Sequence, residues 1–209
     1  MFGNAQGLRP VRSIDNGTFV GGELSLRQTA PSGAAWGWEA ELRTAGGRLH
    51  GDERAFSFLR PGVSARANRN WTERNGQLEL QGSAGAAGGE LPRQALYLLG
   101  GRGTLPGYAF RSFGGDRFAL TQATLSTDLA RPWLRGRAFA GAGWAGSGDA
   151  GARSLEVWGV ETSGSIRTSV RVGAGVFYDV LRLDVARGLG TGGRWELVLE
   201  ANRSFWGML

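Results

Sequence analysis

The chain has 209 residues, 41% of them hydrophobic, which suits a single all-β domain and argues against disorder. It contains no cysteine and one histidine, so a disulfide framework and thiolate chemistry are excluded and no metal-ligand spacing occurs. All 24 basic residues are arginine and the net charge is +6, but the arginines are scattered and matched along the chain by acids. Because no basic cluster with interleaved aromatic residues occurs, we expect no nucleic-acid partner.

Two further sequence patterns indicate whether and how the chain could cross or reach a membrane. No window approaches eighteen consecutive apolar residues, so a transmembrane helix is excluded, whereas a membrane β-barrel stays open because its strands alternate. Residues 1–6 lack the charged region and apolar run of a signal peptide.

The first half of the chain alternates apolar and polar residues. Strands are expected over residues 19–27, 36–43, 55–71 and 77–84. Pro61 and Gly62 interrupt the third, which is therefore either a kinked strand or a hairpin, and Asn75-Gly76 is a strong hairpin signal.

Three shorter segments separate or follow these strands. Residues 45–54 and 85–92 are expected to be loops, and residues 93–99 an apolar strand that carries Tyr97.

The stretch from Gly100 to Phe118 interrupts this alternation with six glycines and a proline. That glycine density excludes a helix and makes a plain strand costly. The stretch nevertheless carries Tyr108, Phe110, Arg111 and Phe113, side chains that a solvated linker does not need. A long loop with aromatic anchors is expected to fold against another surface and to have a function.

Alternation resumes in the second half. Strands are expected over residues 121–129, 135–142, 170–178, 181–186 and 195–202, and residues 155–163 are open between strand and loop. Trp195 and Phe205 share a face ten residues apart, as in a strand bracketed by two interfacial aromatic girdles.

A soluble antiparallel sandwich or barrel would alternate in the same way, but three features favour the membrane. The strands are long, their polar faces carry many charges, and their apolar faces contain much Gly and Ala, which a tightly packed soluble core does not favour. We therefore expect an all-β fold, an antiparallel transmembrane β-barrel or the C-terminal part of one, with about ten strands in a single domain over residues 1–209.

Several short motifs after residue 92 fall in the order found in one known family. They are Gly100-Gly101, Arg111-Ser112-Phe113, Gly114-Gly115-Asp116, Arg135-Gly136-Arg137-Ala138-Phe139, Val172-Gly173-Ala174-Gly175 and Arg182-Leu183-Asp184. Over residues 93–206 the chain resembles the C-terminal barrel of the bacterial surface antigen family, which includes outer-membrane barrel-assembly and protein-translocation factors. The family's Arg-Gly-aromatic loop tip is matched by Arg111-Ser112-Phe113, with Ser112 in place of the usual glycine.

This resemblance implies a non-enzymatic barrel in the outer membrane of a Gram-negative bacterium, with a role in outer-membrane protein assembly or protein translocation. It implies that the loop folds into the barrel lumen, where Arg111, Ser112 and Phe113, with Tyr108 and Phe110, form its lumen motif. The implied partners are outer-membrane lipid and unfolded outer-membrane or secreted proteins, and no cofactor or metal is implied.

Two departures from the family shape the expectation. The position of the acid that helps to hold the loop arginine is Gly141 here, so Asp184, Glu200 and Asp128 are candidate partners for Arg111. An unpaired buried guanidinium would be expensive. About ten strands stand against the family's sixteen, so we expect a C-terminal piece of a longer chain or a reduced barrel, with Phe205 or Trp206 as the terminal aromatic signal.

Catalytic readings have less support. The barrel could anchor an outer-membrane lipase or peptidase whose catalytic part lies upstream. Intrinsic catalysis would have to use His50, which lies in a glycine-rich turn where a solvated histidine is the ordinary outcome. We therefore predict no catalytic residue and no enzymatic activity.

Overall fold

The computed structural model describes residues 14–30, 36–51, 55–148, 160–176 and 180–201. These residues form an almost entirely β structure built on a ten-stranded antiparallel sheet, as predicted. The long strands are β1 (Thr18–Thr29), β2 (Gly37–His50), β3 (Ala55–Trp71), β4 (Gly76–Ala86), β8 (Arg117–Ala130), β9 (Leu134–Gly146), β10 (Arg167–Val176), β11 (Leu181–Gly188) and β12 (Trp195–Ala201). No helix among the described residues is long and apolar enough to cross a bilayer.

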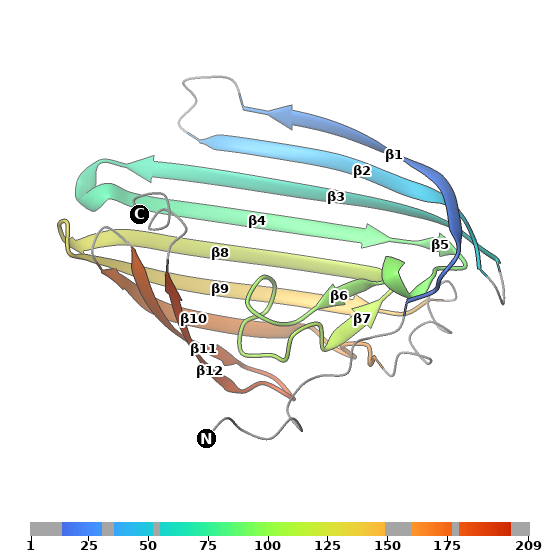
Figure 1. The fold of residues 1–209 in the computed structure, drawn as a ribbon. Helices are drawn as coiled ribbons and strands as arrows, with labels where there is room; N and C mark the ends of the chain where they lie inside the picture. The colour runs from blue at the N-terminus through green and yellow to red at the C-terminus, as the bar shows by residue number, and fades with distance from the viewer. Residues whose placement is uncertain (1–13, 31–35, 52–54, 149–159, 177–179, 202–209) are drawn as a thin grey trace.

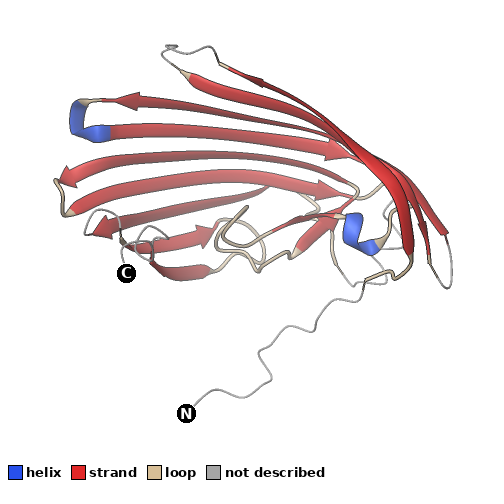
Figure 2. Cartoon of the chain, turned by 45° about the horizontal axis from the view of Figure 1, so that its top comes forward, coloured by secondary structure: helices blue, strands red, loops and turns tan. Residues whose placement is uncertain are grey.

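The sheet follows chain order from β1 to β12, except that β8 pairs directly with β4 and the short β5 (Gly88–Gly89) pairs with β3. A separate hairpin of β6 (Tyr97–Leu99) and β7 (Phe113–Gly115) carries the glycine-rich loop between its strands. Figures 1 and 2 show that the sheet is strongly curved, with one concave and one convex face, and that this hairpin and its loop lie on the concave side. Five long strands follow the loop, in agreement with the sequence expectation.

Two segment predictions in the first half need correction. Residues 45–50, expected to be loop, continue β2 and pair with β1 on one side and β3 on the other. Gly46 and Gly47 have no side chains, so the apolar–polar alternation cannot be seen there in the sequence. A side chain on Gly47 would clash with the Val20 carbonyl of the neighbouring strand β1. Close backbone approach therefore requires glycine at this point of the strand.

The segment around Pro61 is one continuous seventeen-residue strand, so the hairpin alternative is wrong. Residues 93–95 form a single 3-10 turn, η3 (Arg93–Ala95), and only residues 97–99 are strand. The carboxylate of Asp15 fixes this turn by accepting hydrogen bonds from the Arg93 backbone N–H at 2.7 Å and from the Arg93 guanidinium at 2.7–2.9 Å. A contact across 78 residues thus overrides the local apolar pattern.

The convex face of the sheet is apolar and exposed. Because side chains alternate between faces, the pairing registers place one set of aliphatic residues together on the side away from the loop. Each of the following is at least 40% exposed: Val20, Leu24, Leu26, Leu42, Val63, Leu80, Leu125, Val172, Leu183, Leu197 and Leu199.

The concave face is polar and carries cross-strand ion pairs. Arg27 contacts Glu39 at 3.0 Å and Glu41 at 3.4 Å. Arg66 lies 3.4 Å from Glu79. Two clusters of buried hydrophobic residues lie between this face and the segments on it, the first formed by Leu91, Ala95, Leu96 and Val160, the second by Leu99, Leu105, Tyr108, Phe113 and Ala145. The sheet therefore does not bury its apolar face against a second sheet among the described residues.

Part of the sequence prediction lies outside the described residues. This applies to Phe205 and Trp206 and to most of the 155–163 segment.

Candidate functional site

The candidate site is the loop over residues 100–116, called the inner loop below, which crosses the concave face from β8 to β12. At the β8 side, the Gln122 amide donates hydrogen bonds to the carbonyls of Gly103 at 3.3 Å and Thr104 at 2.8 Å. At the β12 side, the Gly107 backbone N–H donates to the Glu196 carboxylate at 3.0 Å. The loop thus connects an interior strand of the sheet to its last strand.

A tight turn shapes the first part of the inner loop. The backbone N–H of Gly101 donates to the Leu105 carbonyl at 3.1 Å, and that of Thr104 donates to the Gly101 carbonyl at 3.1 Å. Gly100 and Gly101 have φ values of +109° and +90°, which side-chain-bearing residues rarely adopt. The glycine density that first marked this stretch in the sequence therefore serves a compact turn.

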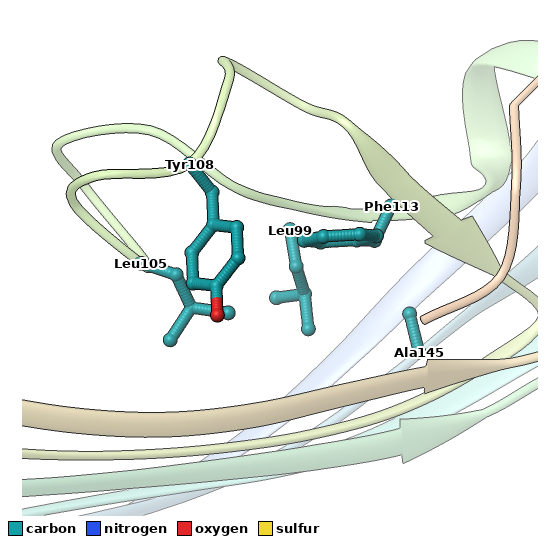
Figure 3. Close-up of a cluster of buried hydrophobic side chains, with 5 residues drawn as sticks. All are labelled: Leu99, Leu105, Tyr108, Phe113 and Ala145. Carbon is teal, nitrogen blue, oxygen red and sulfur yellow. The ribbon is translucent and has the colours of Figure 1, made fainter. Parts of the chain in front are cut away.

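The aromatic anchor of the loop is Tyr108, which is almost fully buried (Figure 3). Its ring meets Phe113 edge-on at 5.4 Å, and Leu99, Leu105 and Ala145 complete the cluster. The Tyr108 hydroxyl donates to the Thr168 carbonyl of β10 at 3.2 Å and accepts from the Gly190 N–H at 2.8 Å. One side chain therefore joins the loop to β10 and to the turn between β11 and β12.

The predicted tip has a different environment. Arg111 has φ of +51°, its backbone N–H donates to the Gly100 carbonyl at 3.1 Å, and its guanidinium lies 4.9 Å from the Phe110 ring centre. Phe110 is exposed, whereas Phe113 turns into the buried cluster. Ser112 closes this bend through its backbone N–H, which donates to the Ala109 carbonyl at 3.2 Å.

The three acids proposed as partners of Arg111 lie near other arginines. Asp184 is buried and lies 3.8 Å from Arg171. Glu200 lies 3.9 Å from Arg102. Asp128 pairs with Arg131 at 3.0 Å and Arg135 at 2.9 Å. The pairing of Arg111 with any of the three stays a prediction.

Sequence reasoning missed Arg102, a loop arginine that contacts carboxylates of the sheet. Its guanidinium lies 3.3 Å from Glu196 and 3.9 Å from Glu200, both on the concave face of β12. The apolar–polar alternation of β12 placed both acids on the polar face of that strand. Nothing in the loop sequence indicates which of its arginines contacts them.

The second leg of the loop is fixed by buried polar groups. The Asp116 carboxylate, which is fully buried, accepts from the Gly148 N–H at 2.7 and 2.9 Å. Gly114 donates its N–H to the Glu161 carbonyl at 3.0 Å, and Phe113 forms a parallel bridge with Glu161. These contacts fix both ends of β7, so the loop is tied at its base as well as at its centre.

Tyr97 fastens β6 to the sheet. Its hydroxyl donates to the Pro61 carbonyl at 3.1 Å, and the Arg60 guanidinium stacks over its ring at 4.0 Å. Burial raises the pKa of Tyr97 above its ordinary value, although the nearby Arg60 charge opposes this shift. The hydroxyl therefore stays protonated and able to donate at neutral pH.

The acidic side chains and the histidine are dispersed in the described part of the chain. No three Asp, Glu or His side chains gather there in a way that could hold a metal ion. His50, the candidate base, lies at the exposed end of β2 on the convex side.

Comparisons with known proteins agree with the fold. The chain is similar to the crystal structure of BamA from Haemophilus ducreyi lacking POTRA domains 1–3, with a TM-score of 0.57 and 15% sequence identity. The likeness covers 86% of this chain and 42% of that one, so the chain spans less than half of the BamA structure. No family model and no curated protein matches the sequence. The likeness shows a barrel fold of the BamA type, built from an antiparallel sheet.

Proposed function

We propose that the chain forms part of the wall of a bacterial outer-membrane β-barrel, with its convex face in lipid and the inner loop on the lumen side. The observation that carries this proposal is the exposed apolar convex face, backed by a polar and ion-paired concave face. Exposed apolar surface on this scale is not stable in water without a cover, whereas a bilayer requires it.

Aromatic residues support the same orientation. Trp133 precedes β9 at the end away from the inner loop, and Trp144 lies near the other end of that strand. At about 3.3 Å per residue and a tilt of roughly 40°, the interval between them spans about 28 Å of height, close to the apolar band of outer-membrane barrels. Trp38 and Trp71 lie at the same end as Trp133, and Trp195 lies at the opposite end.

The role follows from the fold likeness and the loop. A barrel of the BamA type with a loop across its inner wall supports a non-enzymatic function in outer-membrane protein assembly or protein translocation. Its partners are then membrane lipid and unfolded outer-membrane or secreted proteins.

Membrane location is tested by expressing the chain with a periplasmic targeting signal in a Gram-negative host. We expect recovery in the outer-membrane fraction and slower migration on a denaturing gel after heating than before, as folded barrels show. Recovery as a soluble monomer would refute the proposal.

The assembly role is tested separately with vesicles that contain the purified chain. We expect them to accelerate the folding of an unrelated outer-membrane barrel over matched empty vesicles. An unchanged folding rate, with the chain inserted, would leave a membrane barrel without an assembly function.

A further inference from the structure

We propose that the convex face binds the phosphate groups of anionic lipid at the end of the sheet where the inner loop begins. The residues that bind them are Arg48, Arg117 and Arg187, called the arginine rim below. This binding rests on the proposed function, because it requires that the convex face lies in lipid.

Charge is divided unequally between the two faces of the sheet. Because paired residues share a face, the registers place the acidic residues of the described strands together on the concave face. These are Glu23, Glu39, Glu41, Glu79, Asp128, Asp184, Glu196 and Glu200. The charged residues that the same strands place on the convex face are Arg48, Arg69, Arg117 and Arg187. A face whose strand charges are all positive is complementary to a negatively charged partner.

The convex arginines lie at the ends of their strands. Arg48 lies near the end of β2, Arg117 is the first residue of β8, and Arg187 lies next to the last residue of β11. These three ends lie on the side of the sheet that carries the long β4–β8 and β9–β10 connections, whereas Arg69 lies at the opposite end. A lipid-facing arginine costs little near the interface, where its guanidinium reaches the headgroups. The strand-end positions therefore suit contact with headgroups.

The guanidinium groups of the arginine rim are available to an external anion. Among the described residues, Arg48 and Arg187 form no ion pair, and the Arg187 guanidinium lies 5.3 Å from the centre of the Trp195 ring. The Arg117 side chain is 59% exposed and lies 3.8 Å from Asp116, whose buried carboxylate accepts from a backbone N–H at 2.7 and 2.9 Å. Arginine is suited to phosphate because it can donate two parallel hydrogen bonds to it.

An apolar hollow, called the basin below, adjoins Arg117 on the same face. It has a volume of about 490 Å³, within the range of ligand sites. The convex side chains that line it are Ala119, Thr121, Ala142, Trp144 and Ile166. It opens on the convex face because the inner-loop cluster fills the other side, where a Cβ on Gly143 would meet Leu99 and Leu105 at 3.2–3.3 Å.

The arginine rim and the basin together fit an amphiphile with an anionic head. The Trp144 ring lies over Gly146, which is the cross-strand partner of Arg117, so the indole and the guanidinium lie side by side at the head of the basin. Arg117 then meets the phosphate while an acyl chain lies in the basin. Arg48 and Arg187 extend the same contact to neighbouring lipids, so the convex face retains anionic lipid in preference to neutral lipid with the same chains.

Photo-crosslinking of the full chain in phosphatidylcholine vesicles tests the arginine rim. The probe is a trace of phosphatidylglycerol or of phosphatidylcholine, each with the same photoreactive group beside the headgroup, and mass spectrometry locates the labelled residues. We expect the phosphatidylglycerol probe to label residues 117–121 and 142–146 more strongly than the neutral probe does. Arg117→Gln should reduce this preference about fivefold. Arg69→Gln, on the same face at the opposite end, should leave it unchanged.

The basin is tested with the photoreactive group placed midway along the acyl chain. Ala142→Leu fills the basin, whereas Ala174→Leu adds the same volume to the convex face of β10 outside it. We expect labelling of residues 119–121 to fall only in Ala142→Leu. Equal labelling in the two variants would contradict the basin.

Two results separate failure of the arginine rim from failure of the proposed function. Equal labelling of the rim by both headgroup probes, or an equal loss in Arg69→Gln and Arg117→Gln, would overturn the rim but leave the convex face in lipid. If neither probe labels the convex strands, the proposed function is refuted and the rim with it. Arg187→Gln repeats the test at residues 195–197 if Arg117→Gln does not fold.

Discussion

Tyr108 stabilises the inner loop in two ways. Its ring packs in the hydrophobic cluster under the loop, and its hydroxyl forms hydrogen bonds to β10 and to the β11–β12 turn. Tyr108→Phe keeps the ring and removes the bridge, which leaves the Gly190 N–H without its acceptor. We expect a loss of about 1–3 kcal/mol in the free energy of unfolding. Denaturant titration in micelles measures it.

The control for Tyr108→Phe is Phe110→Leu, which changes an exposed ring of the same loop. Equal stability of the two variants would show that the hydroxyl bridge contributes nothing.

Gly107 and Gly103 form a matched pair for the close approach of the loop to the hairpin. An added Cβ at Gly107 clashes with the backbone of Gly188 at a φ of +80°, whereas one at Gly103 meets nothing within 4 Å. We expect Gly107→Ala to undock the loop at a cost of more than about 1 kcal/mol, and Gly103→Ala to change stability little. Limited proteolysis of the inner loop should be faster only in Gly107→Ala, and equal cleavage of both would contradict the close contact.

The residue scale is also where sequence reasoning was weakest. The aromatic and glycine content of residues 100–118 marked a loop that packs on something, and Tyr108 and Phe113 do lie in a buried cluster. The ionic contacts could not be assigned, because Arg102 and Glu196 are separated by 94 residues and meet only once the sheet has curved. Loop arginines look alike in sequence until the registers of β8 and β12 are known.

At the scale of elements, the period-two pattern located most strands, because each strand has one apolar and one polar face. It failed where small residues hide the pattern, as at Gly46 and Gly47 in β2. At Pro61 it left a strand and a hairpin open, and a continuous strand accommodates the proline. In both places pairing with neighbouring strands, not local propensity, decides the structure.

The cluster under the inner loop is expected to hold β6, β7 and the loop together as one unit. Leu105 is fully buried in it, and Leu105→Ala would leave a cavity between the loop and β9. We expect a loss of about 2–5 kcal/mol. The readout is the loop's hydrogen-exchange protection together with denaturant stability. Leu129→Ala, at an exposed site at the end of β8, is the control, and similar losses in both would show that the cluster is not a core.

At the scale of the whole molecule, the alternation of apolar and polar residues predicted that the sheet has one apolar and one polar face. The structure shows that the polar face is the concave one. The open edges were not predictable, since they depend on which strands meet at long range. The path from β1 to β12 has nine antiparallel strands, so its two edge strands run in the same direction. An all-antiparallel closure therefore needs an odd number of further strands.

Adjacent residues at the middle of β3 offer a direct test of which face meets lipid. Val63 lies on the convex face and is 51% exposed, while Ser64 lies on the concave face opposite Glu41. In a bilayer, Val63→Arg places a charge near the apolar midplane at a cost of about 2–4 kcal/mol, whereas Ser64→Arg meets an acidic neighbour and costs little. In water, both are substitutions at exposed sites and change stability by less than about 0.5 kcal/mol. Denaturant unfolding of the two variants from lipid vesicles measures their free energies of unfolding and shows whether the convex face lies in lipid or in water. Equal stability of the variants would place the convex face outside the membrane.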